Sequence, residues 1–378
     1  MAKIALTVEP KNPKFKFRLA SGLIGMAREE PVAKRASHML IKATAALSEL
    51  RKDDNLKFPV LEDQILEICQ RRKQIHIAPF FHRLPSFWTN KKHFSYRYHD
   101  ECPGYESNLV IFMHGFGDNF KAMENLCLQM KLPHAASLCL NGPHQLSEDL
   151  VGKEAYSWFD LLDDDYNFIT PSKDNKRRLT SLKATRAQHL DPLFDHLIND
   201  CGWDPCNIFL IGFGQGAVMA ADFLWNPAKC LADSKKKCLL GGVVAKMGSV
   251  LPERWLCEDL SISSSESNEG DDKKTDEEQA KGLFLLSKTQ DQPPCSLGVE
   301  SIKRLHHRGV KCESNIEKNA GLTLTPTEAR KVFKFLSDRM LIPGLPKSAK
   351  DAGFVEVAPG SCDLEHIDTI VEEPAQGA

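Results

Sequence analysis

The stretch Ile208-Phe-Leu-Ile-Gly-Phe-Gly-Gln-Gly-Ala-Val-Met-Ala220 decides the fold of this 378-residue chain. An apolar run leads into a glycine-rich turn and then into small residues, which predicts a buried strand that passes directly into a helix. A strand-to-helix turn of the form Gly-x-Ser-x-Gly is the frame of a nucleophile elbow. Here Gly212 and Gly216 hold the outer positions, and Gly214 stands where the motif has its serine. The sequence therefore predicts the elbow without its hydroxyl.

The chain on either side of this turn alternates strand-like and helix-like segments. The patterns predict strands over 94–99, 108–113, 136–140, 239–244 and 282–287, and helices over 120–130, 179–200 and 327–340. Such alternation is typical of a mostly parallel sheet that is covered by helices on both faces. We therefore expect one α/β domain over residues 79–342.

Three regions lie outside that pattern. Residues 1–78 carry helical periodicity, which predicts a helical N-terminal extension. Residues 258–281 almost lack apolar side chains and 343–378 form an acidic tail with prolines, so we expect a disordered insertion and a disordered tail. Basic and apolar residues alternate over 11–19. That alternation leaves open either an edge strand or a segment that touches an anionic membrane.

Composition excludes several classes of protein. A net charge of −2 gives no electrostatic argument for nucleic acid as a partner. The sequence has no run of 18 or more apolar residues, so we expect no transmembrane segment. Its 12 cysteines include no Cys-x-x-Cys pair, so neither a zinc site nor a compact disulfide framework is predicted. We expect a cytoplasmic protein with reduced thiols, no metal and no cofactor.

Four segments in order resemble the phospholipase/carboxylesterase family of α/β-hydrolases, which includes acyl-protein thioesterases. They are Val110-Ile-Phe-Met-His-Gly-Phe-Gly-Asp118, Leu140-Asn-Gly-Pro143, Ser157-Trp-Phe-Asp160 and Gly212-Phe-Gly-Gln-Gly-Ala217. The resemblance covers roughly residues 80–342 and implies an α/β-hydrolase fold. The glycine turn alone would also fit a dinucleotide loop. Its late position in the expected sheet, and the lack of an acidic residue after the next expected strand, argue against that.

The resemblance implies a role for each matching residue. The backbone N–H groups of Phe116 and Gln215 correspond to the oxyanion donors. Asp291 matches the triad acid, Gly214 the nucleophile position, and Gly321 or Leu322 the histidine position. The remaining motif residues are His114, Gly115, Gly117, Asp118, Gly212, Gly216 and Trp158. The resemblance thus implies an α/β-hydrolase with a degenerate catalytic triad.

Other side chains could replace the missing groups only from elsewhere in the chain. We interpret His306 and His307 as surface residues of a helix rather than a repositioned base. His114 is expected to shape the oxyanion loop, and Cys139 to be buried packing. No serine, threonine or cysteine lies between Phe209 and Asp222, which excludes a replacement nucleophile at the elbow.

Two functions therefore remain open. The first is a binding or regulatory pseudohydrolase that takes an acyl or lipid-ester ligand and engages a protein partner through its N-terminal helices, acidic loop or tail. The alternative is an active carboxylic-ester or thioester hydrolase with a displaced nucleophile. Removing a triad nucleophile or base costs about a million-fold in turnover, so the residues favour the first function.

Overall fold

The computed structural model describes residues 13–30, 33–51, 59–72, 74–75, 78–97, 106–132, 134–147, 153–228, 239–256, 280–287, 295–318 and 321–341. The expected tail 343–378, and the expected insertion except for residues 280–281, lie outside these ranges. Asp291, the expected triad acid, also lies outside the described residues.

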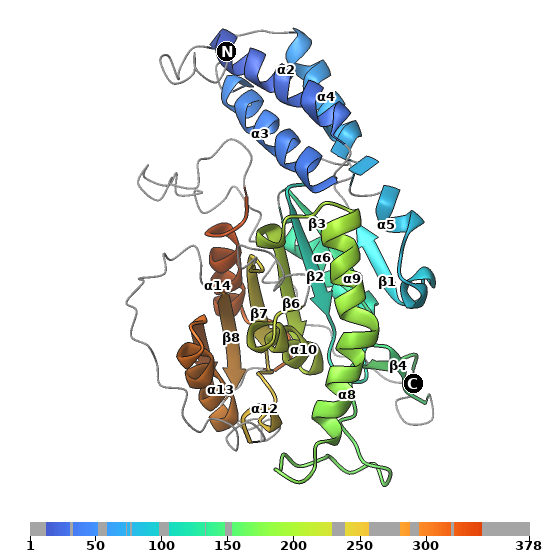
Figure 1. Ribbon diagram of the computed structural model, residues 1–378. Coiled ribbons are helices and arrows are strands. Elements are labelled where there is room, and N and C mark those ends of the chain that lie inside the picture. The colour runs from blue at the N-terminus through green and yellow to red at the C-terminus, as the bar shows by residue number, and fades with distance from the viewer. Residues whose placement is uncertain are drawn as a thin grey trace, which may run out of the picture.

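A seven-stranded sheet in the order β1-β3-β2-β6-β7-β8-β9 forms the centre of the α/β region (Figure 1). Its strands are β1 (Phe94–Arg97), β2 (Asn108–Met113), β3 (Ala135–Leu140), β6 (Ile208–Phe213), β7 (Gly242–Lys246), β8 (Lys281–Ser287) and β9 (Lys311–Glu317). Only β1 runs antiparallel to its neighbour, and all other pairs are parallel. The predicted α/β-hydrolase fold is confirmed.

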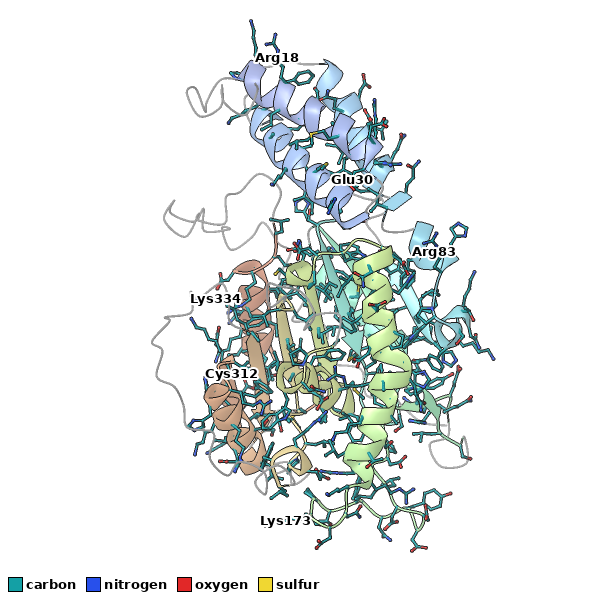
Figure 2. The ribbon with its side chains drawn as sticks, viewed as in Figure 1. Arg18, Glu30, Arg83, Lys173, Cys312 and Lys334 are labelled. Carbon is teal, nitrogen blue, oxygen red and sulfur yellow. The ribbon has the colours of Figure 1, made fainter. Side chains whose placement is uncertain are left out.

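Helices cover both faces of the sheet because successive strand residues point to opposite sides. In β2, Leu109 and Ile111 join one apolar core, whereas Val110 and Phe112 join the other. The first core packs against α10 (Gln215–Trp225), α12 (Glu253–Leu256), α13 (Cys295–His307) and one continuous helical run, α8 (Arg177–Thr185), η3 (Arg186–Leu190), α9 (Asp191–Asp195) and η4 (His196–Asp200). The second packs against α6 (Phe120–Met130) and α14 (Pro326–Ser337). Side chains fill both layers (Figure 2).

The helices α2 (Pro13–Glu29), α3 (Ala33–Arg51) and α4 (Pro59–Arg72) form a separate bundle with its own apolar core. The edge strand considered for residues 11–19 is wrong, because residues 13–19 are the start of α2. The apolar spacing continues beyond the alternating segment as Phe17, Ala20, Ile24 and Ala27, which is a helical period that faces the bundle core. None of the helices in the described ranges is long and apolar enough to cross a membrane.

The bundle lies at the amino ends of the strands, at the opposite edge of the sheet from the loops that follow β2, β6 and β7 (Figure 1). Arg72 at the end of α4 donates to the Ser107 hydroxyl at 3.5 Å, directly before β2 begins. Figure 2 shows the same separation, with Arg18 and Glu30 at one end of the molecule and Lys173 at the other.

Several elements differ from the sequence prediction. β7 begins three residues later than its predicted start, and β9 was not predicted, because its mostly polar residues give no apolar pattern. The short elements α5 (Ala78–His82), η2 (Ser86–Thr89), η5 (Pro205–Asn207), β4 (His144–Gln145) and β5 (Tyr156–Ser157) were not predicted either. β4 and β5 pair as a two-stranded ribbon beside the main sheet.

Candidate functional site

Gly214 lies at the apex between β6 and α10. Its backbone angles are φ 51° and ψ −114°, in a region that side-chain-bearing residues rarely adopt. Its N–H donates to the Lys246 carbonyl at 2.8 Å, and its own carbonyl accepts from the Val218 N–H at 3.1 Å. These bonds hold a sharp strand-to-helix turn, which is the elbow geometry that the sequence predicts.

Gly212 and Gly216 allow the elbow to pack backbone against backbone. A Cβ on Gly216 would collide with the carbonyl groups of Met113 and His114, and one on Gly212 would collide with the Gly216 carbonyl. The Gly216 N–H donates to the His114 carbonyl at 3.0 Å, which ties α10 to the end of β2. The two outer glycines are therefore required by close approach.

The apex itself has room for a side chain. A Cβ on Gly214 would meet Leu322 Cδ2 at 3.5 Å and Gly115 Cα at 3.6 Å, which are ordinary van der Waals separations. Leu322, the residue expected at the histidine position, therefore lies beside the residue at the nucleophile position. The position that was expected to hold an imidazole thus carries a leucine methyl group beside Gly214.

His114 is fully buried in the loop that follows β2. Its Nε2 accepts from the Gly142 N–H at 2.9 Å, so its Nδ1 carries the proton and donates to the Gly115 carbonyl at 2.6 Å. Burial lowers the pKa of His114 to about 4. The imidazole is thus neutral at neutral pH, and both of its nitrogens are used to shape the loop.

The rest of this loop is anchored on β5. Gly117 has φ 75°, and its N–H donates to the Tyr156 carbonyl at 3.1 Å. Asp118 accepts from the Tyr156 N–H through its carbonyl at 2.9 Å and forms an ion pair with Lys153 at 3.4 Å. The Phe116 N–H has no hydrogen-bond acceptor among the residues that the structure describes.

Trp158 connects the loop that follows β2 with the elbow. Its indole N–H donates to the His114 carbonyl at 2.9 Å, and its backbone N–H donates to Gln215 Oε1 at 2.8 Å. The Gln215 side chain also donates to the Phe159 carbonyl at 2.5 Å. Trp158 is fully buried, so it is core rather than cavity wall. The Gln215 side chain is thus held by two backbone groups, and its backbone N–H has no acceptor among the described residues.

A cavity of about 260 Å³ lies at the carboxyl ends of β2, β6 and β7. It brings together Gly115, Phe116, Gly214, Gln215 and Leu322, as the resemblance implies. Its remaining walls are mostly apolar and include Phe159, Leu161, Phe168, Val218, Met247, Val250, Leu251, Pro252 and Leu297, with Ser249 and Arg178 as the polar members. Among the described residues that line it there is no histidine, cysteine or carboxylate.

The other candidates for catalysis do not reach this cavity. His306 and His307 are exposed at the end of α13, and Cys139 is fully buried within β3. The described ranges hold no group of three or more His, Cys, Asp or Glu side chains that could bind a metal ion.

Sequence reasoning missed the charged pair in the cavity wall. Arg178, in the first turn of α8, donates to both carboxylate oxygens of Glu253 at 2.7 and 2.9 Å. Both side chains are buried, and the two residues are 75 positions apart. No local sequence pattern indicates that Arg178 and Glu253 pair, so the pair becomes visible only in the folded structure.

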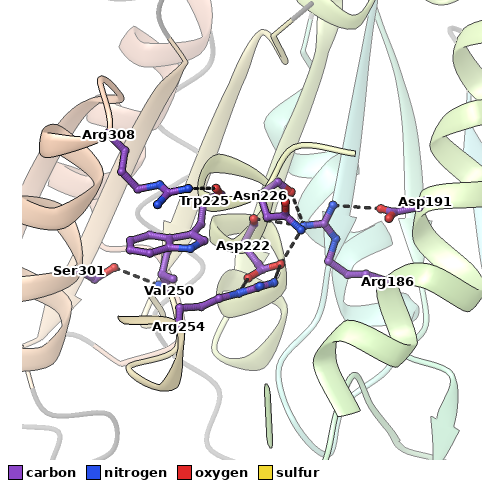
Figure 3. A network of polar contacts seen from close by, with 9 residues as sticks. All are labelled: Arg186, Asp191, Asp222, Trp225, Asn226, Val250, Arg254, Ser301 and Arg308. Atoms are coloured by element: carbon purple, nitrogen blue, oxygen red, sulfur yellow. Dashed lines mark hydrogen bonds and ion pairs between the residues drawn. The ribbon is translucent and has the colours of Figure 1, made fainter. Parts of the chain in front are cut away.

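A second buried network holds α12, which carries Glu253, against the rest of the domain (Figure 3). The Asp222 carboxylate on α10 accepts from Arg186 at 2.8 Å and from two nitrogens of Arg254, each at 2.8 Å. Arg186 also donates to Asp191 at 3.0 Å, and Val250 donates its N–H to the Ser301 hydroxyl at 3.1 Å. The cavity wall is therefore tied to α10, α13 and the long helical run.

A further buried ion pair, between β7 and α14, supports the elbow. Lys246, at the end of β7, donates to both carboxylate oxygens of Glu328 at 2.6 and 2.7 Å, and neither side chain is exposed. Glu328 also completes a capping box with Thr325 at the start of α14. Because the Lys246 carbonyl accepts from Gly214, this pair connects the elbow with the segment that carries Leu322.

Comparisons with known proteins find similarity to hydrolases. Residues 102–261 match the family model described as Phospholipase/Carboxylesterase. An uncharacterized hydrolase of Mycosarcoma maydis is 31% identical over 158 residues, 41% of this chain and 54% of that protein. An uncharacterized hydrolase of Schizosaccharomyces pombe is 30% identical over 147 residues, 38% of this chain and 54% of that protein. The chain spans about half the length of these curated relatives.

The fold is also similar to solved structures. The crystal structure of esterase PE8 superposes with a TM-score of 0.47 at 20% sequence identity, over 66% of this chain and 99% of that one.

Proposed function

We propose that this chain, whose residues 102–261 match the phospholipase/carboxylesterase family model, binds an acyl or lipid-ester ligand without hydrolysing it. It would act as a binding or regulatory pseudohydrolase. The cavity at the elbow is the ligand site in this proposal, and the degenerate triad is the reason that turnover is absent.

The observation that carries the proposal is the pairing of Gly214 with Leu322. An acyl-transfer site of this fold needs a hydroxyl at the apex and an imidazole beside it. Gly214 offers no side chain, and Leu322 places a methyl group 3.5 Å from where its Cβ would stand. A site without nucleophile and base would lose about a million-fold in turnover, which leaves only what the oxyanion donors and binding supply.

The cavity supports the binding half of the proposal. Its mostly apolar walls suit an acyl chain, and its volume of about 260 Å³ lies slightly below the usual range for ligand sites, about 300–1,000 Å³. It would therefore hold a short acyl group or one part of a longer one. Exposed Phe168 and Leu322 at its edge leave a path for the remainder.

One observation favours the alternative of an active hydrolase with a displaced nucleophile. Ser249, three residues after the end of β7, is the one hydroxyl-bearing residue among those described around the cavity. It has no histidine beside it in the cavity wall, and a serine without a base is a weak nucleophile at neutral pH. Ser249→Ala is therefore the variant that separates the two functions.

The test measures ester and thioester hydrolysis by the purified full chain, together with labelling by a fluorophosphonate probe. We expect wild type and Ser249→Ala to give the same background rate. Gly214→Ser alone should add little, whereas Gly214→Ser with Leu322→His should give measurable turnover, provided that Asp291 supplies the acid. Leu322→His alone is the matched control. Wild-type turnover at enzymatic rates that Ser249→Ala or Asp291→Asn abolishes would contradict the proposal.

The proposal also includes the division of the chain into regions and the regions that would bind a protein partner. We propose a division into a helical extension at 1–78, a hydrolase domain at 79–342 and a tail at 343–378, in a cytoplasmic protein. A protein partner would bind the N-terminal helices, the acidic insertion 258–281 or the tail. Deleting each region and repeating a pull-down with the full chain as reference would show which one is needed.

A further inference from the structure

We infer that the ligand of the elbow cavity carries a free carboxylate: the anion of an aliphatic carboxylic acid, with its oxygens at the backbone N–H groups of Phe116 and Gln215. The hydrocarbon chain would lie against the apolar wall. This inference rests on the proposed function, because an active esterase would hold its acyl group only transiently. The inference specifies that the polar end of the acyl ligand proposed above is a carboxylate.

The apex of the elbow is open toward the cavity because Gly214, which lines it, has no side chain. In a working elbow the nucleophile fills this space. Here a Cβ would have only Leu322 Cδ2 at 3.5 Å and Gly115 Cα at 3.6 Å as neighbours. A carbonyl group needs room for one oxygen at the donors, whereas a carboxylate needs room for two. The vacant apex supplies the second position.

The two donors favour a negative group. Gln215 begins α10, an 11-residue helix, and the first N–H groups of a helix have no partner within it and carry partial positive charge. The Phe116 N–H has no acceptor within the described ranges. Backbone N–H groups at a helix start, here that of Gln215, form an anion site when side-chain chemistry supports it, and Phe116 lines the same cavity.

Side-chain chemistry around the cavity does support it. Besides Gln215, the polar side chains in its wall are Arg178 and Ser249, which are donors and are more than nine-tenths buried: Arg178 is 8% exposed and Ser249 is 4% exposed. Glu253 accepts two of the five N–H groups of the Arg178 guanidinium, and the described residues offer no acceptor for the rest. Ser249 likewise has no hydrogen-bond partner in the part of the chain that the structure describes.

The charge of the cavity wall favours a carboxylic acid anion over the corresponding ester as the ligand. Arg178 and Glu253 together are neutral, but only the cationic member lines the cavity, and no carboxylate among the described residues lines it. A carboxylate would form charge-assisted hydrogen bonds, which are roughly twice as strong as those of a neutral carbonyl. An ester or an alcohol of the same length would fill the same apolar wall without that gain.

The experiment is calorimetric titration of the full chain at pH 7.5 with decanoate, methyl decanoate and decanol. We expect decanoate to bind at least about tenfold more tightly than either neutral compound, a difference of about 1.4 kcal/mol. Equal affinities would overturn the inference and leave the proposed function standing. Binding of none of the three would overturn both. If methyl decanoate is hydrolysed, the proposed function fails, and decanoate against decanol still tests the carboxylate.

A double variant identifies the source of the preference. Arg178→Met with Glu253→Gln removes both charges and leaves no buried charge without a partner. The preference for decanoate should fall to less than about threefold, while the affinity for methyl decanoate changes less than about twofold. The matched control is Arg339→Met with Glu313→Gln. It removes an ion pair whose nitrogen and oxygen are 3.0 Å apart and whose residues do not line the cavity. An unchanged preference in the first double variant would overturn the role of Arg178.

A second variant keeps the inference testable if that double variant does not fold. Gly214→Ala fills the vacant apex with a methyl group at ordinary contact distances. It should weaken decanoate about tenfold and leave methyl decanoate nearly unchanged, because only the carboxylate uses the second oxygen position. Equal weakening of both compounds, or of neither, would contradict the placement of the carboxylate.

Discussion

Two sets of positions around the cavity differ in what they demand of the sequence. At Gly212 and Gly216 the packing leaves no space for a Cβ, because backbone atoms of neighbouring segments occupy it. At Gly214 an added Cβ would meet Leu322 and Gly115 only at ordinary contact distances, so packing does not exclude a side chain, although the φ of 51° favours glycine. The difference shows that the shape of an elbow is maintained by backbone contacts and buried pairs that are independent of the reaction. A site can therefore keep its geometry without its nucleophile.

The largest effect is expected from the buried pair that supports this framework. Lys246→Met leaves the Glu328 carboxylate buried without its partner, which should lower the free energy of unfolding by about 3–5 kcal/mol. Urea denaturation measures it. Lys246→Met with Glu328→Gln should recover most of the loss, and exposed Lys183→Met should stay within about 0.5 kcal/mol of wild type. Equal losses in the single and double variants would show that the ion pair does not support the elbow.

The next effect concerns close approach. Gly216→Ala should destabilise the protein by about 3 kcal/mol, at the upper end for an overpacked site, because the new methyl group overlaps the carbonyl groups of Met113 and His114. Gly22→Ala is the matched control in an exposed helix, since no atom lies within 4 Å of its added Cβ. It should stabilise α2 by about 0.5–1 kcal/mol. If both variants shift the urea midpoint alike, the packing argument fails.

A smaller effect should depend on pH. The pKa of His114 is lowered to about 4 in the folded protein, against about 6.5 in the unfolded chain. Between these values the unfolded chain binds more protons, so stability falls as pH decreases from 6.5 toward 4. The loss from His114 should be about 2 kcal/mol between pH 7 and pH 5.

Burial also lowers the pKa of His93 and His189, so the readout for His114 has to be a difference between variants. His114→Gln should be less stable than wild type at pH 7 and should lose less stability on acidification. His306→Gln, an exposed control, should follow wild type. Parallel pH curves for wild type and His114→Gln would contradict the buried neutral imidazole.

The smallest effect is expected at Gly214, the position where an active hydrolase would have its nucleophile. Gly214→Ala should cost about 1–2 kcal/mol, because its φ of 51° is unfavourable for a residue with a Cβ although the space is open. Gly115→Ala is the matched control in the same cavity, since its Cβ would meet the Phe213 carbonyl at 3.6 Å without a positive φ. It should cost less than about 0.5 kcal/mol. A larger loss at Gly115 than at Gly214 would reverse the argument.

Local pattern was enough to predict the fold around the elbow. The residues from Ile208 to Ala220 predict a strand, a turn and a helix within one short window. The structure has β6, the Gly214 turn and α10 at these positions. The start of α2 was misjudged because a window of nine residues is too short to separate alternation from a helical period. The edge strand β9 was missed because it buries too little to need apolar residues.

The candidate site was predictable only where its parts are backbone groups in sequence motifs. Phe116, Gly214, Gln215 and Leu322 line one cavity, as the resemblance implies, and their roles stay predictions. The pairs that build the walls join residues 75 and 82 positions apart, and a single sequence carries no signal of such contacts. Asp291 lies outside the described residues, so its role as triad acid stays a prediction too.

The bundle of α2, α3 and α4 sits at the amino ends of the strands, while the cavity opens at their carboxyl ends (Figure 1). A protein docked on the bundle would therefore leave the cavity mouth uncovered. Ligand and partner would not compete for the same surface, and each could be exchanged while the other stays bound.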